Sequence, residues 1–275
     1  MINLMFCGND KIYDGLLISL LSIVKYNKEP LNINVITVDL SDIDEKYTPI
    51  TEAHRKELEE VIKKANFKSE IKVIDISKQF REEMMEGKNM KTHYTPYIFL
   101  RLFADKIKEL PDNVLYMDID IVCYDDIAKI YNTDISNYEF AAAKDYYGKW
   151  FIDINYMNSG VLLMNLKKLR ETNALSKCRQ MCLDKKMLLP DQTALNKCCK
   201  FKLPLPRKFN EQKKRTEDTV VRHFSMTMKF IPYFKTINIK PWHIDEVHNV
   251  YKIYDYEDII EEYKKIIRSN ENVKK

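Results

Sequence analysis

Two aspartates separated by a single residue offer the clearest opportunity for chemistry in this sequence. They end the segment VLYMDID (residues 114–120), whose apolar start is typical of a buried strand. Because side chains alternate along a strand, Asp118 and Asp120 are expected on one face and Ile119 on the other. Two carboxylates this close repel one another unless a cation lies between them. A divalent metal site would explain the pattern, but by itself such a pair is more often an acidic exit from a strand into a loop.

Two common phosphate-binding motifs are missing from the chain, and their absence indicates how a phosphate-bearing ligand would have to be bound. Ligands of an open α/β sheet bind at the carboxyl ends of its strands, where a metal could hold a pyrophosphate. The five glycines (Gly8, Gly15, Gly87, Gly148 and Gly160) form neither a GxGxxG nor a GxxxxGKS pattern. A phosphate-bearing ligand would therefore need a metal rather than a glycine-rich loop.

The elements that must position these aspartates alternate between strand and helix. Strands are predicted at residues 2–7, 31–40, 71–76 and 114–126, and helices at 16–27, 50–67 and 95–110, the last ending before Pro111. Further strands are predicted at 139–145, 158–165 and 219–225, and helices at 166–187, 189–199 and 258–275. This order indicates βαβ units and a mostly parallel sheet covered on both faces. We expect an α/β domain over residues 1–250 and a helical tail over residues 251–275.

Composition excludes several classes of protein. The 275 residues are 45% hydrophobic and 31% charged, which is typical of a globular chain. The net charge of +4 is spread along the sequence, whereas a nucleic-acid binder concentrates its positive charge. No signal peptide or bilayer-spanning run is expected, and membrane contact would be peripheral at most.

The six cysteines lack the dense spacing of a disulfide scaffold, which favours a reducing cytoplasm. Cys178 and Cys182 lie one helical turn apart and Cys198 and Cys199 follow, so a zinc site is an alternative. No CxxC pair occurs, and both segments are expected to be helix packing positions.

Several segments in a fixed order resemble those of glycosyltransferase family 8. They are residues 6–27, 113–131 around VLYMDID, AAAKD (141–145), MNSGVLLMNLKKLR (157–170), LPDQTALN (189–196), RHF (222–224) and KPWH (240–243). The resemblance implies the GT-A fold, with a Rossmann-like, mostly parallel central sheet and helices on both faces. It also implies a retaining transferase that moves a hexose, commonly glucose or galactose, from a UDP-sugar to a glycan, a lipid-linked acceptor or another hydroxyl group.

The resemblance further implies the metal ligands and the diphosphate contact. Asp118 and Asp120 match the family's metal-binding DxD, and His223 matches the histidine that completes the ligands. Two oxygen donors and one imidazole suit Mn²⁺, with Mg²⁺ as a substitute. Lys240 matches a lysine that contacts the diphosphate, and Lys229 is its rival because the loop of residues 225–239 intervenes.

The expected catalytic residues are Gln192, Asp191 and Asp145. Asp145 and Asn158 match positions that contact sugar hydroxyls, and Gln192 matches a residue near the anomeric carbon. Front-face attack through an oxocarbenium-like state is favoured over a double displacement with Asp191 as the nucleophile. The residues expected to bind the donor are Cys7, Asn9, Asp10, Tyr13, Arg101, Asp118, Ile119, Asp120, Asn158, Ser159 and Lys240.

The N-terminal segment departs from the family pattern. NDKIY (residues 9–13) stands where DDNY is common, so the ring that stacks on the base is either Tyr13, shifted by one position, or is replaced by Ile12. The nucleobase contact is therefore less defined than the metal site.

These positions also have structural alternatives. Arg101 could pair with Asp105, Asp145 could close a strand, and residues 158–160 could form a plain turn. His223 could be a core histidine, and residues 191–192 could form the first turn of a helix. Three further histidines, expected on the surface, are His54, His93 and His248. For the whole chain, the alternatives are a non-catalytic sugar-nucleotide-binding protein and a metal-dependent nucleotidyltransferase.

Overall fold

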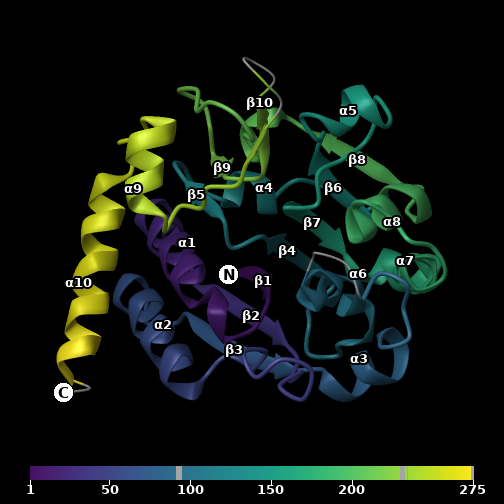
Figure 1. Ribbon diagram of the computed structural model, residues 1–275, viewed down its shortest axis with the longest axis horizontal. Helices are drawn as coiled ribbons and strands as arrows, with labels where there is room; N and C mark the ends of the chain where they lie inside the picture. The colour runs from purple at the N-terminus through teal and green to yellow at the C-terminus, as the bar shows by residue number, and fades with distance from the viewer. Residues whose placement is uncertain (91–94, 230–232, 234, 274–275) are drawn as a thin grey trace.

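The computed structural model describes residues 1–90, 95–229, 233 and 235–273. At its centre is a seven-stranded sheet in the order β3-β2-β1-β4-β7-β6-β8 (Figure 1). The strands are Ile2–Cys7 (β1), Leu31–Thr37 (β2), Glu70–Asp75 (β3), Asn113–Met117 (β4), Phe140–Ala143 (β6), Val161–Asn165 (β7) and Lys202–Leu205 (β8). Strands β3, β2, β1 and β4 are parallel, and β7 is antiparallel to both of its neighbours. The prediction of a mostly parallel α/β sheet is confirmed.

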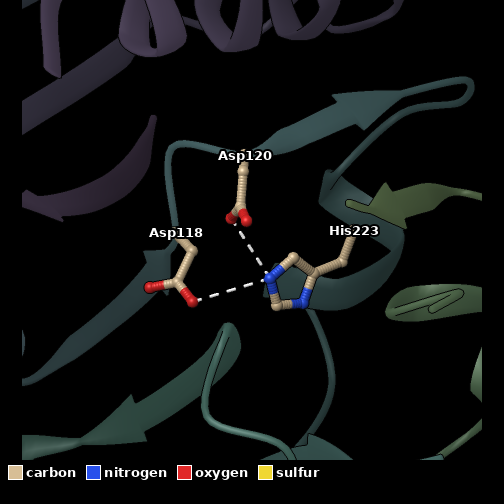
Figure 2. Close-up of side chains that lie close together, drawn as sticks. All are labelled: Asp118, Asp120 and His223. Atoms are coloured by element: carbon tan, nitrogen blue, oxygen red, sulfur yellow. Dashed lines mark ion pairs between the residues drawn. The ribbon is translucent and has the colours of Figure 1, made fainter. Parts of the chain in front are cut away.

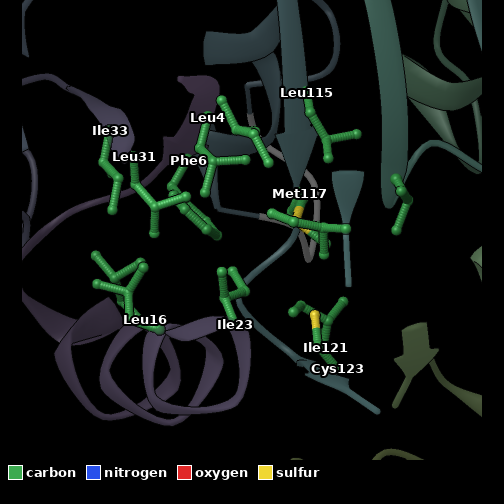
Figure 3. Close-up of a cluster of buried hydrophobic side chains, with 14 of the residues drawn as sticks. Leu4, Phe6, Leu16, Ile23, Leu31, Ile33, Leu115, Met117, Ile121 and Cys123 are labelled. Carbon is green, nitrogen blue, oxygen red and sulfur yellow. The ribbon is translucent and has the colours of Figure 1, made fainter. Parts of the chain in front are cut away.

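Helices α1 (Tyr13–Tyr26) and α2 (Glu52–Ala65) cover one face of the parallel strands. Leu4 and Phe6 of β1 pack against Leu16 of α1 in a core that Leu115 of β4 also joins (Figure 3). These strand residues are two positions apart, so they point to the same face of the sheet.

The intervening residues build a second core on the opposite face. Met5 of β1 and Tyr116 of β4 are fully buried there. The covering elements are Ser77–Met84 (α3), Pro96–Lys106 (η2), Leu166–Thr172 (α6), Ala174–Asp184 (α7) and Pro190–Cys198 (α8). Burial on both faces explains why β1 and β4 are almost continuously apolar. The helix predicted over residues 95–110 is a 3-10 helix that ends earlier, at Lys106.

The single strand predicted over residues 114–126 is wrong, because it is divided in two. β4 ends directly before the first aspartate, and β5 (Ile121–Cys123) pairs antiparallel with β9 (Val221–His223) in a separate small sheet. The sequence is apolar on both sides of the division, so its pattern does not reveal where the chain leaves the main sheet.

Hydrogen bonds from distant elements stabilise the turn between β4 and β5. The Ser19 hydroxyl in α1 donates to the carbonyl oxygen of Ile119 at 2.8 Å. The backbone N–H of Phe224 donates to the carbonyl oxygen of Asp120 at 2.8 Å. The two aspartates therefore lie in a turn between sheets rather than along a strand.

The remaining elements complete the rim and the tail. They are Asp10–Ile12 (η1), Ala128–Tyr131 (α4), Gly148–Phe151 (α5), Arg207–Phe209 (η3), Thr227–Lys229 (β10), Lys235–Ile237 (β11), Ile244–Glu246 (α9), Val247–Tyr251 (the π-helix η4) and Glu257–Val273 (α10). The predicted terminal helix is confirmed as α10, which lies beside α1 (Figure 1). Its Tyr263 hydroxyl donates to Asp14 Oδ1 at 2.8 Å. In the described part of the chain, each helix is too short or too polar to cross a bilayer.

Candidate active site

Asp118, Asp120 and His223 converge between the two sheets (Figure 2). The His223 Nε2 atom lies 3.1 Å from Asp120 Oδ1 and 3.7 Å from Asp118 Oδ2. One ligand atom from each residue lies within 4.8 Å of the others, and among the described residues this is the one group of its kind. Two carboxylates and an imidazole form a donor set that fits Mn²⁺ or Mg²⁺.

His223 is oriented from its other ring nitrogen. Nδ1 lies 3.1 Å from Asn210 Oδ1, and the Asn210 amide donates to Asn158 Oδ1 at 2.9 Å. A hydrogen bond of this kind fixes the ring of a metal-ligating histidine and leaves the far nitrogen for the metal. His223 is only 4% exposed, yet Nε2 faces two carboxylates rather than apolar core.

Positive side chains balance these carboxylates. Lys240 Nζ lies 2.5 Å from Asp120 Oδ2 and donates to the Phe224 carbonyl oxygen at 3.3 Å. Burial alone would raise the pKa of Asp120, but Lys240 and His223 outweigh burial and hold that pKa well below its usual range. Burial opposes the charge of His223, but Asp120 raises the pKa of the imidazole above its ordinary value. The side chain of the rival Lys229, at the end of β10, lies outside the described part of the chain.

Arg101 of η2 holds Asp118 from the other side. Its Nη2 donates to Asp118 Oδ1 at 2.9 Å, and its Nη1 donates to the Ser159 carbonyl oxygen at 2.7 Å. Its Nε lies 3.5 Å from Asp191 Oδ2. The alternative pairing with Asp105 is wrong, because that carboxylate pairs at 2.6 Å with an arginine of α7.

Asp145, which follows β6, is bound on both carboxylate oxygens. Oδ2 accepts hydrogen bonds from Asn158 Nδ2 at 2.8 Å and from Gln192 Nε2 at 3.2 Å. Oδ1 accepts from the backbone N–H of Gly148 at 2.6 Å. Gln192 Oε1 in turn accepts from the Ser159 N–H at 2.9 Å. The segments 145, 158–159 and 192, far apart in sequence, therefore form one polar network.

Asp191 occupies the first turn of α8, as the structural alternative predicted. It is 7% exposed, and burial raises the pKa of its carboxyl group although Arg101 opposes that shift. The Ser159 hydroxyl lies 3.4 Å from Asp191 Oδ2. The helical position does not remove Asp191 from the network.

Cys7 and Asn9, two of the predicted donor-binding residues near the N-terminus, lie at the carboxyl end of β1. Cys7 ends β1 beside Arg101 and Asp118, and burial raises the pKa of its thiol. Asn9 is buried and donates to the Lys46 carbonyl oxygen at 3.0 Å.

Asp10 and Tyr13 both contact His54. Asp10 Oδ1 lies 2.7 Å from His54 Nδ1. The Tyr13 ring stacks on the same imidazole, with centroids 4.0 Å apart, and its hydroxyl donates to Glu57. One face of the Tyr13 ring is therefore already covered.

Two of the histidine predictions need correction. His54 and His248 have side chains only 22% and 23% exposed, and His248 Nε2 lies 2.6 Å from Glu257 Oε1. They are partners in local networks rather than surface residues. His93 lies outside the described residues.

The side chain of Ile119 lies against α1. A Cβ placed on Gly15 of α1 would lie 2.9 Å from Ile119 Cδ1 and 2.5 Å from the Trp242 ring. Ile119 and Trp242 therefore pack on the surface of α1, and this contact anchors the turn of residues 118–120 to that helix.

The sequence did not indicate the roles of Asn210 and Gly160. Asn210 is fully buried and links His223 to Asn158. A Cβ on Gly160 would lie 2.2 Å from His223 Cε1 and 2.9 Å from Asp118 Oδ2, so this glycine makes room for two of the candidate metal ligands. The NSG motif was visible as a turn, but no local signal pointed to its contact with the histidine.

The zinc alternative finds no support in the described residues. All six cysteines are free thiols, and among the described residues the potential metal ligands come together only at Asp118, Asp120 and His223. Cys178 and Cys182 are buried in the packing between α7 and its neighbours, as expected for helix packing positions.

Comparisons with known proteins agree with this geometry. The sequence model of the family described as Glycosyl transferase family 8 matches residues 3–246. A lipopolysaccharide 1,2-glucosyltransferase of Escherichia coli K12 is 28% identical over 178 residues, covering 57% of this chain and 52% of that protein. A probable glycosyl transferase of Streptococcus gordonii is 34% identical over 111 residues, covering 39% of this chain and 16% of that protein. The chain thus spans about half or less of these curated relatives.

Solved structures share the fold. The galactosyltransferase LgtC, in complex with donor and acceptor sugar analogs, superposes with a TM-score of 0.64 at 19% identity, covering 96% of both chains. GlyE of Streptococcus pneumoniae TIGR4 superposes with a TM-score of 0.61 at 19% identity, covering 95% of this chain and 63% of that one. The predicted GT-A fold is confirmed. With a family match over residues 3–246 and this fold, the chain belongs to glycosyl transferase family 8.

Proposed function

We propose that the chain is a metal-dependent, retaining glycosyltransferase that moves a hexose, glucose or galactose, from a UDP-sugar to a hydroxyl group of a glycan or lipid-linked acceptor. One observation carries this proposal: a continuous hydrogen-bonded network joins the candidate metal ligands to the residues expected around the sugar. It runs from His223 through Asn210 and Asn158 to Asp145 and Gln192. A diphosphate at the metal ligands would therefore leave its sugar beside Asp145 and Gln192.

The charged residues suit the departure of a nucleoside diphosphate. A divalent cation held by Asp118, Asp120 and His223 would supply a Lewis acid for the charge that develops on the leaving group. Lys240 is 21% exposed and reaches the site on a flexible stem, so its ammonium can turn from Asp120 to a phosphate oxygen. Arg101 fixes Asp118 and so keeps one ligand in place.

The polar network suits the positioning of a sugar. Backbone N–H groups and Asn158 fix the Asp145 carboxylate, whose remaining lone pairs can accept sugar hydroxyls. Ser159 and Asp145 hold both ends of the Gln192 amide, which gives it one orientation toward the anomeric carbon. Fixed geometry of this kind lowers the barrier to reaction of two bound groups.

Retention by front-face attack is the mechanism that these environments support. A double displacement would need Asp191 as an ionised nucleophile, but burial raises the pKa of its carboxyl group, and Arg101 and Ser159 both contact its Oδ2 atom. Gln192 cannot act as an inverting base, because an amide has negligible proton affinity at neutral pH. An oxocarbenium-like state beside the leaving diphosphate remains the favoured route.

Calorimetry tests the metal dependence. UDP-glucose and UDP-galactose are titrated into the protein with Mn²⁺, with Mg²⁺ and with a chelator, and binding is expected only with metal. Asp120→Asn should abolish this binding. Asp125→Asn, which removes a nearby carboxylate paired with Lys129, is the matched control and should bind normally. Equal donor affinity with metal and with chelator would contradict the proposal.

Product analysis separates the alternative functions. Free UDP is expected from the donor, whereas a nucleotidyltransferase releases pyrophosphate and a binding protein releases neither. Proton NMR of the first product from an α-linked donor is expected to show an α-anomeric coupling. A β coupling would contradict retention and the roles given to Asp191 and Gln192.

We also propose that residues 1–250 form the transferase domain, that residues 251–275 form its helical tail, and that the protein acts in the cytoplasm. Ile259 and Ile260 of the tail are buried in the packing around α1, and six free thiols suit a reducing compartment. Truncation after residue 250 should lower the melting temperature while donor binding persists. Loss of donor binding in a folded truncated chain would contradict this division.

A further inference from the structure

A basic cavity of about 720 Å³ adjoins the candidate active site. It lies between residues 212–215, β9 and its following residues, and residues 251–255 at and after the end of η4. Among the residues that the structure describes, its charged lining comprises five cations and one carboxylate: Lys213, Lys214, Arg215, Arg222, Lys252 and Asp255. Asp118, Asp120 and Lys240 are not part of this lining, whereas His223 is, so the cavity adjoins the expected diphosphate site and shares one residue with it.

Arg222 is the least exposed cation of the cavity, with a relative exposure of 9%. It neighbours His223 on β9, so the two side chains point to opposite faces of the small sheet. Its Nη2 donates to the Lys213 carbonyl oxygen at 2.8 Å, and its guanidinium lies 4.8 Å from the centre of the Phe224 ring. Among the described residues, no carboxylate oxygen lies within 4.0 Å of its nitrogens. A buried guanidinium with further N–H donors and no counter-charge favours binding of an anion.

Arg215 adds a second incompletely paired guanidinium. Its Nε is buried without a hydrogen-bond partner in the described structure, and its Nη1 lies 3.7 Å from Asp255 Oδ2. Asp255 also accepts a hydrogen bond from the Tyr124 hydroxyl at 2.6 Å. The single carboxylate of the lining is therefore shared and cannot neutralise five cations.

The cavity shares walls with the candidate sugar site. The Lys213 ammonium donates to the hydroxyl groups of Tyr147 and Thr227, and Gln212 Oε1 accepts from the Tyr146 N–H at 2.9 Å. Both tyrosines directly follow Asp145 in sequence. His223 also lines the cavity, while its Nε2 faces the metal-binding carboxylates. A molecule in this cavity would therefore lie beside the expected position of the transferred sugar.

We propose that this cavity binds a phosphate group carried by the acceptor, so that the enzyme selects phosphorylated sugars or glycans. That the bound molecule is the acceptor rests on the proposed transferase function. That the cavity binds a phosphate group does not depend on that function. A phosphate carries up to two charges and several strong acceptor oxygens, which matches two guanidinium groups and three ammonium groups better than a neutral glycan does. The volume lies in the range of about 300–1,000 Å³ that small-molecule sites occupy, which is room for a sugar together with its phosphate.

Calorimetry with three probes tests the proposal. Glucose 1-phosphate, inorganic phosphate and methyl α-glucoside are each titrated in chelator, which keeps metal from recruiting phosphate to the aspartates. Glucose 1-phosphate is expected to bind at least about tenfold more tightly than either other probe, because it combines charge with sugar contacts. Equal affinity for inorganic phosphate would make the cavity a site for the free ion, and equal affinity for the glucoside would exclude anion recognition. Absence of binding by all three would overturn the proposal.

Variants assign the binding to the cavity. Arg222→Gln and Arg215→Gln should each weaken glucose 1-phosphate binding by about tenfold or more. Arg268→Gln, at an exposed position of α10, is the matched control and should bind normally. If Arg222→Gln unfolds, Arg215→Gln still decides, because its side chain is 37% exposed. Normal binding in folded Arg215→Gln and Arg222→Gln would overturn the assignment.

Competition separates this cavity from the donor site. The titration is repeated with saturating UDP and Mn²⁺, and glucose 1-phosphate affinity is expected to change by less than about twofold. Displacement of glucose 1-phosphate by UDP would mean that the cavity belongs to the donor diphosphate and would overturn the acceptor assignment. Failure of the proposed transferase function would appear instead as metal-independent UDP-sugar binding, with the titration in chelator unchanged.

Discussion

Gly160 gives a sharp test of how closely the candidate metal ligands are packed. A Cβ at this position would lie 2.2 Å from Cε1 and 2.6 Å from Nδ1 of His223, and 2.9 Å from Oδ2 of Asp118. Since favourable contacts between carbon atoms begin near about 3.5 Å, Gly160→Ala would force the imidazole to retreat by roughly 1 Å. That shift is a large fraction of the 3.1 Å that separates His223 Nε2 from Asp120.

The expected cost has two parts. Disturbing a group that orients a metal ligand weakens metal affinity by about 10- to 100-fold, and we expect this loss of Mn²⁺ affinity in Gly160→Ala. Overpacking of the buried site should also lower the free energy of unfolding by about 1–3 kcal/mol. Calorimetric titration with Mn²⁺ measures the first effect, and thermal unfolding in chelator measures the second.

Gly87→Ala is the control for this prediction. Its added Cβ would lie 2.9 Å from the Met84 carbonyl oxygen, outside the metal site. It should lose stability without losing Mn²⁺ affinity. Wild-type Mn²⁺ affinity in Gly160→Ala, combined with a stability loss like that of the control, would refute the reasoning.

Four further outcomes are expected. Asp120→Asn should lower the melting temperature of the metal-free protein, because Lys240 loses its counter-charge; a rise would show that repulsion between the aspartates dominates. Lys240→Met should weaken UDP binding by about tenfold in calorimetry while Mn²⁺ affinity is retained, and unchanged UDP affinity would remove it from the diphosphate site. Arg101→Lys should lower both stability and Mn²⁺ affinity, because an ammonium cannot hold Asp118 and the Ser159 carbonyl together; wild-type values for both would contradict this. Finally, a hydrogen bond from Cys178 lowers the pKa of Cys198 to about 7, so its rate of alkylation by iodoacetamide should rise through pH 7 and level off near about pH 8; a rise that continues to about pH 9 would contradict the shift.

The candidate metal site is electrostatically balanced rather than purely acidic. Proximity alone suggests that Asp118 and Asp120 repel one another until a cation arrives. In the structure, Arg101 pairs with Asp118, while Lys240 and His223 pair with Asp120. Binding of the proposed metal would therefore displace cationic partners as well as water. This competition predicts weaker Mn²⁺ binding at lower pH, where His223 keeps its proton.

Local pattern was sufficient for most of the main sheet. Apolar runs such as residues 2–7 fixed the strands, and the amphipathic segment 50–67 fixed α2 within two residues at each end. Periodicity works here because burial on two faces of a sheet leaves a continuous apolar signal. The DxD aspartates and the order of the later segments were also readable directly from the sequence.

Contacts between distant segments could not be read in the same way. The division between β4 and β5 depends on Ser19 and Phe224, which lie about 100 residues away on either side. The choice of Asp118 over Asp105 by Arg101 depends on an arginine of α7 that already occupies Asp105. Such competition between partners is a property of the packed chain, because sequence spacing does not specify which of two arginines pairs with a given carboxylate.

The cavity beside β9 is the clearest feature that could not be predicted from the sequence. Lys213, Lys214 and Arg215 are visible in the sequence as a short basic run, and Arg222 as a polar residue in a strand. Only the tertiary structure places them around one cavity next to His223, with no carboxylate of the described residues paired with Arg222. Sequence by itself determined most strands and helices of the main sheet and the candidate metal-binding pair, because those follow from local periodicity and residue type. The tertiary structure decided which charged side chains pair with one another, because pairing depends on distances between residues remote in the chain.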